Sequence, residues 1–261
     1  MEGNITRIEL DQFKEAVHLK EMPLVAFSTD RRPEEGLSVH KAHCVMAYIR
    51  MARKKHASAF FSRDQPFCPG GQFYLNVIDI IPEFIPAYVS TGLEGVFEGE
   101  RYCQSPQVVQ RYLEMVKLDP DPRMYRVFKP IDMLKPDETP EMVLFFAEPD
   151  ILAGLYTLVQ FYTGERDAVV APWGAGCTTM YTWVKRYLAD GLQKAVLGGF
   201  DASARPFLER YELSFSMPYA MFQGILECYR ESFIFTKSWG ILKRRIAKGM
   251  SGSEETPKEA R

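Results

Sequence analysis

The sequence predicts an α/β fold, or failing that an α+β fold, in which a mixed, partly parallel sheet is flanked by helices. In the second half, apolar strands and amphipathic helices alternate at the distances of βαβ units, over 142–163, 168–190 and 213–229. The strand Met142–Ala147 is apolar throughout, which is typical of a parallel strand covered by helices on both faces. With 261 residues and 46% apolar side chains, the chain can bury such a core.

The first half supplies short strands and helices in turn. Apolar positions at a helical period predict helices over 5–21, from Ser38 to about Lys55, from Pro82 and from Ser105 to Val116. Short apolar runs predict strands over 23–28 and 58–62.

The second half has clearer boundaries between its elements. Strands are expected over 125–129, 142–147, 168–171, 195–200 and 213–216, and helices over 150–162, 177–190 and 218–229. The prolines near 119–123 mark a soft internal boundary. We therefore expect one compact domain over 1–250, made of two interdigitated halves, and a polar, disordered tail over 251–261.

Charge and hydropathy narrow the classes of partner. The chain carries 32 Lys and Arg against 34 Asp and Glu, so nothing draws it electrostatically to nucleic acid or to an anionic membrane. It shows no secretory leader and no apolar run long enough to span a bilayer, which predicts a cytoplasmic location. A small-molecule ligand or substrate is the expected partner; the oligomeric state stays open, a homo-oligomer included.

Five cysteines, an odd number, are spread along the chain without a secretory signal. A disulfide framework is therefore not expected, and no Cys-x-x-Cys pair indicates a zinc ribbon, a thioredoxin-type site or a bacterial ferredoxin. Any metal site must be assembled by the fold from distant residues.

The most informative stretch is Asp167–Thr179, in which an apolar strand runs into a glycine turn and a helix start. Gly174 and Gly176 allow positive φ or close approach to a ligand, and free amides at a helix start favour a thiolate at Cys177. The stretch could hold a metal or an anion. The plain alternative is that Cys177 is a small, inert core residue.

Two further cysteines stand in comparable places. Cys68 lies in a Pro/Gly turn after a strand, and Cys44 lies in the first half of the helix expected from Ser38. Three thiolates can hold a four-iron cluster with one iron open to a ligand, or one zinc with an open position. Cys103 could be a fourth ligand, while Cys228 fits the core of a helix.

Other chemistries receive less support from the motifs. The glycine turn lacks the lysine of a phosphate loop and the third glycine of a dinucleotide fingerprint. A thiol enzyme would need Cys177 to meet a histidine, and all four histidines lie in the first quarter of the chain. Beyond the strand near 198–200, Asp201 and Arg205 could orient a polar ligand at a strand end or pair with each other.

Several ordered motifs resemble the DUF169 family of uncharacterised proteins. They include Cys68-Pro69-Gly70-Gly71, Phe145–Asp150, Ala171–Cys177, Phe200–Pro206 and Ser214–Tyr219, and the resemblance spans roughly residues 20 to 235. It implies a shared fold and a distribution largely in anaerobic bacteria and archaea, which suits an oxygen-sensitive centre. Cys44, Cys68 and Cys177 belong to the matching motifs, whereas Cys103 and Cys228 do not.

The leading hypothesis is therefore an iron–sulfur protein whose 4Fe-4S cluster is held by Cys44, Cys68 and Cys177. Its open coordination position would face a pocket lined by Trp173, Asp201 and Arg205, with redox or Lewis-acid chemistry on a small molecule. Two alternatives stay open. One is a non-catalytic binding or sensor protein whose glycine turns, Gly174 and Gly176, cradle an anion; the other is a thiol enzyme using Cys177. Whether the protein is an enzyme is left open, and zinc is the alternative metal.

Overall fold

The computed structural model describes residues 5–34, 36–38, 44–119 and 121–250. The tail expected over 251–261 lies outside these residues, as do His40 and His43. Ser38, the expected start of a helix, instead belongs to a short strand, and the helix begins at Val45.

A single mixed sheet of eight strands forms the centre of the described chain, in the order β2-β3-β6-β1-β7-β10-β9-β8. The strands are β1 (Leu24–Thr29), β2 (Leu37–Ser38), β3 (Ala59–Ser62), β6 (Tyr125–Pro130), β7 (Met142–Ala147), β8 (Val169–Val170), β9 (Ala195–Gly198) and β10 (Leu213–Pro218). The pairs β2–β3 and β8–β9 are parallel, and the other pairs are antiparallel. The expected α/β class and mixed sheet are confirmed.

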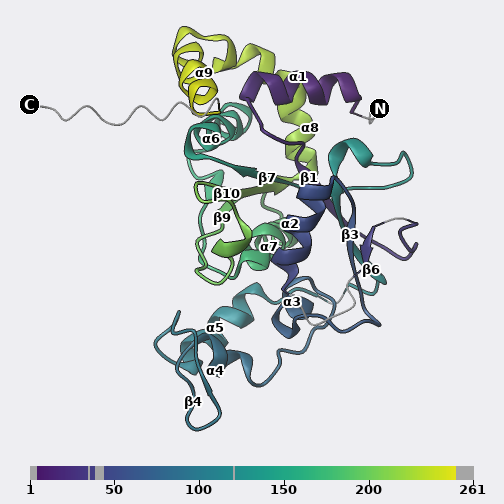
Figure 1. The fold of residues 1–261 in the computed structure, drawn as a ribbon, viewed down its shortest axis with the longest axis vertical. Helices are drawn as coiled ribbons and strands as arrows, with labels where there is room; N and C mark the ends of the chain where they lie inside the picture. The colour runs from purple at the N-terminus through teal and green to yellow at the C-terminus, as the bar shows by residue number, and fades with distance from the viewer. Residues whose placement is uncertain (1–4, 35, 39–43, 120, 251–261) are drawn as a thin grey trace, which may run out of the picture.

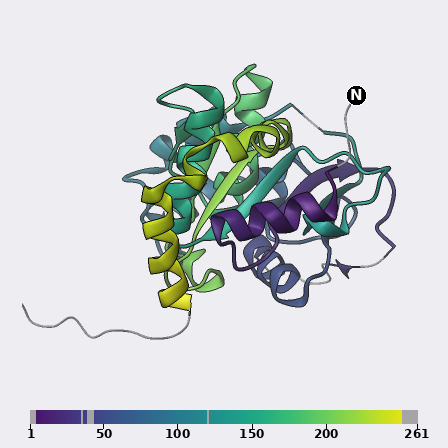
Figure 2. The same ribbon diagram turned by 90° about the horizontal axis from the view of Figure 1, so that it is seen from above.

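Helices cover both faces of this sheet and make three layers (Figure 1). One face carries α1 (Arg7–Val17), α6 (Pro149–Thr163), α8 (Tyr219–Cys228) and α9 (Lys237–Met250). The other face carries α2 (Val45–Lys55), α3 (Pro69–Tyr74) and α7 (Trp183–Ala189). Seen from above, α1 and α9 lie over the same side of the strands (Figure 2).

The central strand β7 shows how burial on both faces arises. Met142, Leu144 and Phe146 pack into the core on the α2 side, and Val143 and Phe145 pack into the core on the α6 side. Both sets are apolar because each face is covered, as the sequence indicated. The expected parallel pairing was wrong for this strand, since β7 runs antiparallel to β1 and to β10. Burial on two faces, and not strand direction, sets the apolar pattern.

The two halves of the chain share this sheet. Strand β6, from the second half, lies between β1 and β3 of the first half. The segment expected as a soft boundary contributes Asp121, a buried carboxylate that pairs with Arg123 and Lys185. No helix among the described residues is both long and apolar enough to cross a membrane.

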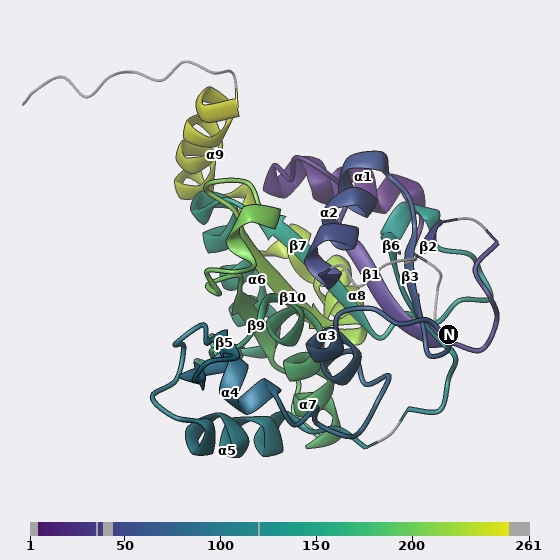
Figure 3. The same cartoon turned by 60° about the horizontal axis from the view of Figure 1, so that its bottom comes forward.

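A smaller group of elements projects from the α3 end of the molecule, opposite α1 and α9 (Figures 1 and 3). It consists of α4 (Ile85–Val89), a two-stranded hairpin of β4 (Gly92–Leu93) and β5 (Phe97–Glu98), and α5 (Pro106–Val116). Its inner residues Ile85, Val109 and Leu113 belong to the same core as α2. This group forms one wall of the cavity described next.

Candidate functional site

Each of the three cysteines singled out by the sequence stands where a helical segment begins. Cys44 is the residue before α2, and Cys68 is the residue before α3. Cys177 lies in the first turn of a helical segment that starts at Gly176 and passes through the π-helical turn Thr178–Thr182 into α7. The expectation that Cys44 lies inside a helix was wrong, because α2 begins one residue later.

Two glycines bring these three helix starts together. A Cβ at Gly71 would lie 2.6 Å from Val45 Cγ2, and a Cβ at Gly176 would lie 2.8 Å from both Met46 Sδ and Ala204 Cβ. Real Cβ atoms do not approach so closely, so only glycine lets the Cys68 and Cys177 turns pack against the first residues of α2. These glycines serve close packing between protein segments, and neither has a positive φ.

The three cysteines line one cavity of about 370 Å³. Cys177 is 8% exposed at its inner end, while Cys44 and Cys68 are half-buried. The cavity is walled largely by aromatic side chains, those of Tyr74, Phe84, Tyr88, Tyr102, Trp173 and Phe207. Three residues that are 24 to 133 positions apart in sequence therefore share one concave surface.

Burial controls the protonation of two of these thiols. It raises the pKa of Cys177 well above the ordinary value of 9.0, and the neighbouring Cys44, Cys68 and Asp201 raise it further. Burial also raises the pKa of Cys44, although the amides of Met46 and Ala47, which hydrogen-bond to its sulfur, act in the opposite direction. The thiolate expected at Cys177 was thus wrong for the ligand-free protein, since loss of hydration outweighs the helix amides.

Asp201 fixes the turn that carries Cys177. Its buried carboxylate accepts the Gly176 N–H at 3.2 Å and the Ser203 N–H at 2.9 Å, and it also accepts the Ser203 hydroxyl. It follows the end of β9, and the Cys177 turn follows the end of β8, the parallel neighbour of β9. The carboxyl ends of parallel strands meet at one edge, so the topology itself places this carboxylate beside the cysteine turn.

Two other predicted site residues lie elsewhere. Arg205 does not line the cavity; its guanidinium donates to the backbone carbonyls of Glu212 and Arg210 and so closes the loop before β10. Nor does it form the expected ion pair with Asp201. Gly174 is also absent from the lining, and a Cβ there would lie 2.6 Å from the Tyr112 hydroxyl, so its role is packing.

Trp173 does line the cavity, at 38% exposure, and its ring packs on Tyr102 at 5.4 Å between centroids. The aromatic wall opposite, from Phe84 and Tyr88, was missed by sequence reasoning. Aromatic residues at helical spacing are usually core residues, so their pattern gave no reason to assign them to a ligand site. Their partial exposure, 40% and 41%, is visible only in the fold.

The remaining cysteines stand apart from this cavity. Cys103 packs against the core on the α2 side without lining the cavity, and the Cys228 thiol donates to the Ile225 carbonyl near the end of α8. Over the described parts of the chain, no group of three or more His, Cys, Asp or Glu side chains is arranged to hold a metal ion. Of the four histidines, His18 and His56 are described, and neither lines the cavity.

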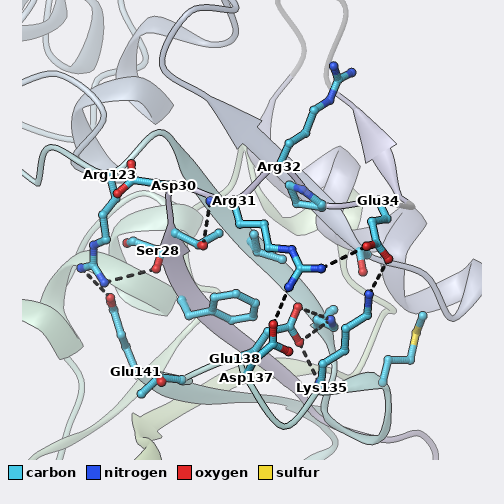
Figure 4. A pocket seen from close by; sticks show the side chains of 18 residues that line it. Ser28, Asp30, Arg31, Arg32, Glu34, Arg123, Lys135, Asp137, Glu138 and Glu141 are labelled. Atoms are coloured by element: carbon cyan, nitrogen blue, oxygen red, sulfur yellow. Dashed lines mark hydrogen bonds and ion pairs between the residues drawn. The ribbon is translucent and has the colours of Figure 1, made fainter.

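A second, larger cavity of about 590 Å³ shares no lining residue with the first. Its walls carry charged side chains that pair with one another: Arg31 with Glu34 and Asp137, Lys135 with Glu34, and Lys129 with Glu138 (Figure 4). Since its main charges are already compensated, we assign the candidate site to the smaller cavity, which contains the nucleophilic and metal-ligating side chains.

Comparison with known proteins identifies a family. Searches of curated proteins and of solved structures find no match. The family DUF169, described as Uncharacterised ArCR, matches residues 12–228, a span that contains the sheet, the cavity and the three cysteines that line it. Because this match covers most of the chain, the protein belongs to the DUF169 family.

Proposed function

We propose that this protein binds an iron–sulfur cluster through Cys44, Cys68 and Cys177, with one coordination position open to the aromatic cavity. The observation that carries the proposal is selective placement. The three cysteines line one cavity from three separate helix starts, whereas Cys103 and Cys228 stand outside it.

The donor set suits a cluster better than a single ion. One zinc needs all its sulfur ligands at about 2.3 Å from the metal, and the described side chains offer no such group. A four-iron cluster presents its irons at separate corners, so its thiolates stand further apart. Three cysteines without a fourth would leave one iron for an outside ligand. Metal coordination would also deprotonate the buried thiols despite their raised pKa values.

The residues around the thiols would support such a centre. Asp201 and Gly176 hold the Cys177 turn in place, and the amides of Met46 and Ala47 hydrogen-bond to the Cys44 sulfur. Hydrogen bonds to sulfur and exclusion of water are the means by which a protein tunes a cluster. When bound, the cluster would supply redox or Lewis-acid chemistry to a small molecule in the cavity.

Iron and sulfide analysis after anaerobic purification and cluster reconstitution tests the proposal. We expect about four irons and four sulfides per chain, the composition of a cubane cluster. Cys44→Ser, Cys68→Ser and Cys177→Ser should each lose most of the bound iron, because a cluster with two cysteine ligands is poorly held. Cys103→Ser and Cys228→Ser are matched controls that should keep it. A reconstituted protein that stays colourless and free of iron would sink the proposal.

A second candidate function is a non-catalytic small-molecule binding or sensor protein. The absence of a metal-holding group among the described side chains favours it, together with a cavity of the size that takes small ligands. The anionic ligand first envisaged fits poorly, because the Gly176 N–H is already bonded to Asp201. Iron-free protein that still binds a small molecule in this cavity would support this function over the first.

A further inference from the structure

The mouth of the cysteine cavity is built from aromatic rings of two separate segments. Trp173 and Tyr102 pack together at 5.4 Å on one side, and Tyr88 lies on α4 on the other side. Trp173 and Tyr88 are 38% and 41% exposed, so their ring surfaces are open to a ligand. Aromatic faces carry negative charge density and attract cations within about 6 Å.

A carboxylate accompanies these rings. Glu100 lines the cavity, is exposed, and accepts a hydrogen bond from the Tyr88 hydroxyl at 2.9 Å. Burial, with the bond to Glu100, raises the pKa of Tyr88 to about 12, so the phenol stays protonated and holds the carboxylate against the ring. The other carboxylate in the lining, Asp201, already accepts three protein donors. Glu100 is therefore the negative charge that a ligand can meet.

All of these features favour the same ligand chemistry. The rings, the Glu100 carboxylate and the sulfurs at the inner end each attract positive charge, and none of the described lining residues is Lys, Arg or His. An anion would meet only repulsion from these side chains. A cavity of about 370 Å³ also limits the ligand to a small molecule.

We propose that the cavity binds a small organic cation with apolar substituents, such as a methylated or quaternary ammonium. The proposal rests on the proposed function for the cation's role as the molecule that faces the cluster. Binding itself depends on the aromatic rings and on Glu100, which do not need the cluster. The two proposals can therefore fail separately.

Titration calorimetry with three probes of one shape tests the ligand class: benzyltrimethylammonium, benzyl alcohol and benzoate. The full chain is purified anaerobically, and iron and sulfide are measured on the same sample. We expect the cation to bind about tenfold more tightly than the alcohol, the order of a cation–π contribution, and benzoate not to bind. Benzoate binding as tight as that of the cation would overturn the inference.

A pair of substitutions on the projecting hairpin segment sharpens the test. Glu100→Gln should weaken cation binding about fivefold and leave benzyl alcohol unchanged, because a partly exposed ion pair contributes on this order. Glu94→Gln is the matched control, since Glu94 is equally exposed but lies outside the cavity. Unchanged cation affinity in Glu100→Gln would also overturn the inference.

Iron content separates this inference from the proposed function. Cation binding by protein without iron and sulfide would uphold the inference and refute the cluster. Protein that carries iron and sulfide but discriminates none of the probes would uphold the cluster and refute the inference.

Discussion

Single residues decide whether the three cysteines can share a cavity. Gly71 and Gly176 lie against Val45 and Met46, the two residues that directly follow Cys44. Each glycine removes the Cβ that would hold its own cysteine turn away from α2. The geometry of the site thus depends on two hydrogen atoms standing where any other residue would place carbon.

Gly176→Ala should therefore lower the free energy of unfolding by about 1–3 kcal/mol, the usual cost of overpacking a core. The added methyl would meet Met46 Sδ and Ala204 Cβ at 2.8 Å. Gly240→Ala is the matched control, because a Cβ there meets nothing within 4 Å, and it should be neutral or stabilise by up to about 1 kcal/mol. Urea denaturation of both variants checks this; equal effects would contradict the packing argument.

The same scale shows what the sequence can and cannot predict about the site. Cys44, Cys68 and Cys177 were singled out by turn chemistry, and the fold places them on one cavity; their role as ligands stays a prediction. Arg205 was misplaced because a sequence does not reveal that nearby carbonyls occupy its guanidinium. The Glu100 and Tyr88 pair was missed because its partners lie 12 residues apart in a segment without a recognisable motif.

At the scale of elements, helix and strand positions follow from periodicity, whereas strand pairing does not. The apolar run of β7 correctly indicated two covered faces but not the direction of its neighbours. The proline-rich segment near 119–123 gave the impression of a linker. Its residue Asp121 instead ties α7, through Lys185, to β6, through Arg126.

This carboxylate should make stability depend on acid pH. Burial alone would raise the pKa of Asp121, but Arg123, Arg126 and Lys185 outweigh it and hold the pKa well below the ordinary 3.8. A lowered pKa in the folded state stabilises the fold above the unfolded value, and this stabilisation is lost as pH falls below 3.8.

Asp121→Asn should thus cost about 3–5 kcal/mol at pH 7, because it leaves the buried Arg126 uncompensated. The difference from the unsubstituted protein should shrink as pH falls below 3.8. Denaturant unfolding across pH 7 to about pH 3 measures both effects. Asp190→Asn, which removes an exposed pair with Arg186, should cost less than about 1 kcal/mol at any pH. A pH-independent loss in Asp121→Asn would contradict this account.

At the scale of the whole molecule, the cavity and the C-terminal helix occupy opposite ends (Figure 1). The family match ends at residue 228, before α9 begins at Lys237. One side chain anchors this helix: Trp239 donates from Nε1 to the Ala16 carbonyl at 3.0 Å, and its ring lies against Gly154 of α6. The outer layer is therefore joined to the domain by a few contacts remote from the candidate site.

Trp239→Ala should release α9 while leaving the cavity intact. Removing a buried tryptophan costs about 3–5 kcal/mol, more than a short peripheral helix gains from its other contacts, so local undocking is expected in place of global unfolding. Hydrogen exchange should then lose protection over residues 237–250 and keep it over 177–189. Phe235→Ala, at a side chain that is 66% exposed, should change neither region. Lost protection around Cys177 would show instead that the two ends are coupled, and that α9 contributes to the stability of the site.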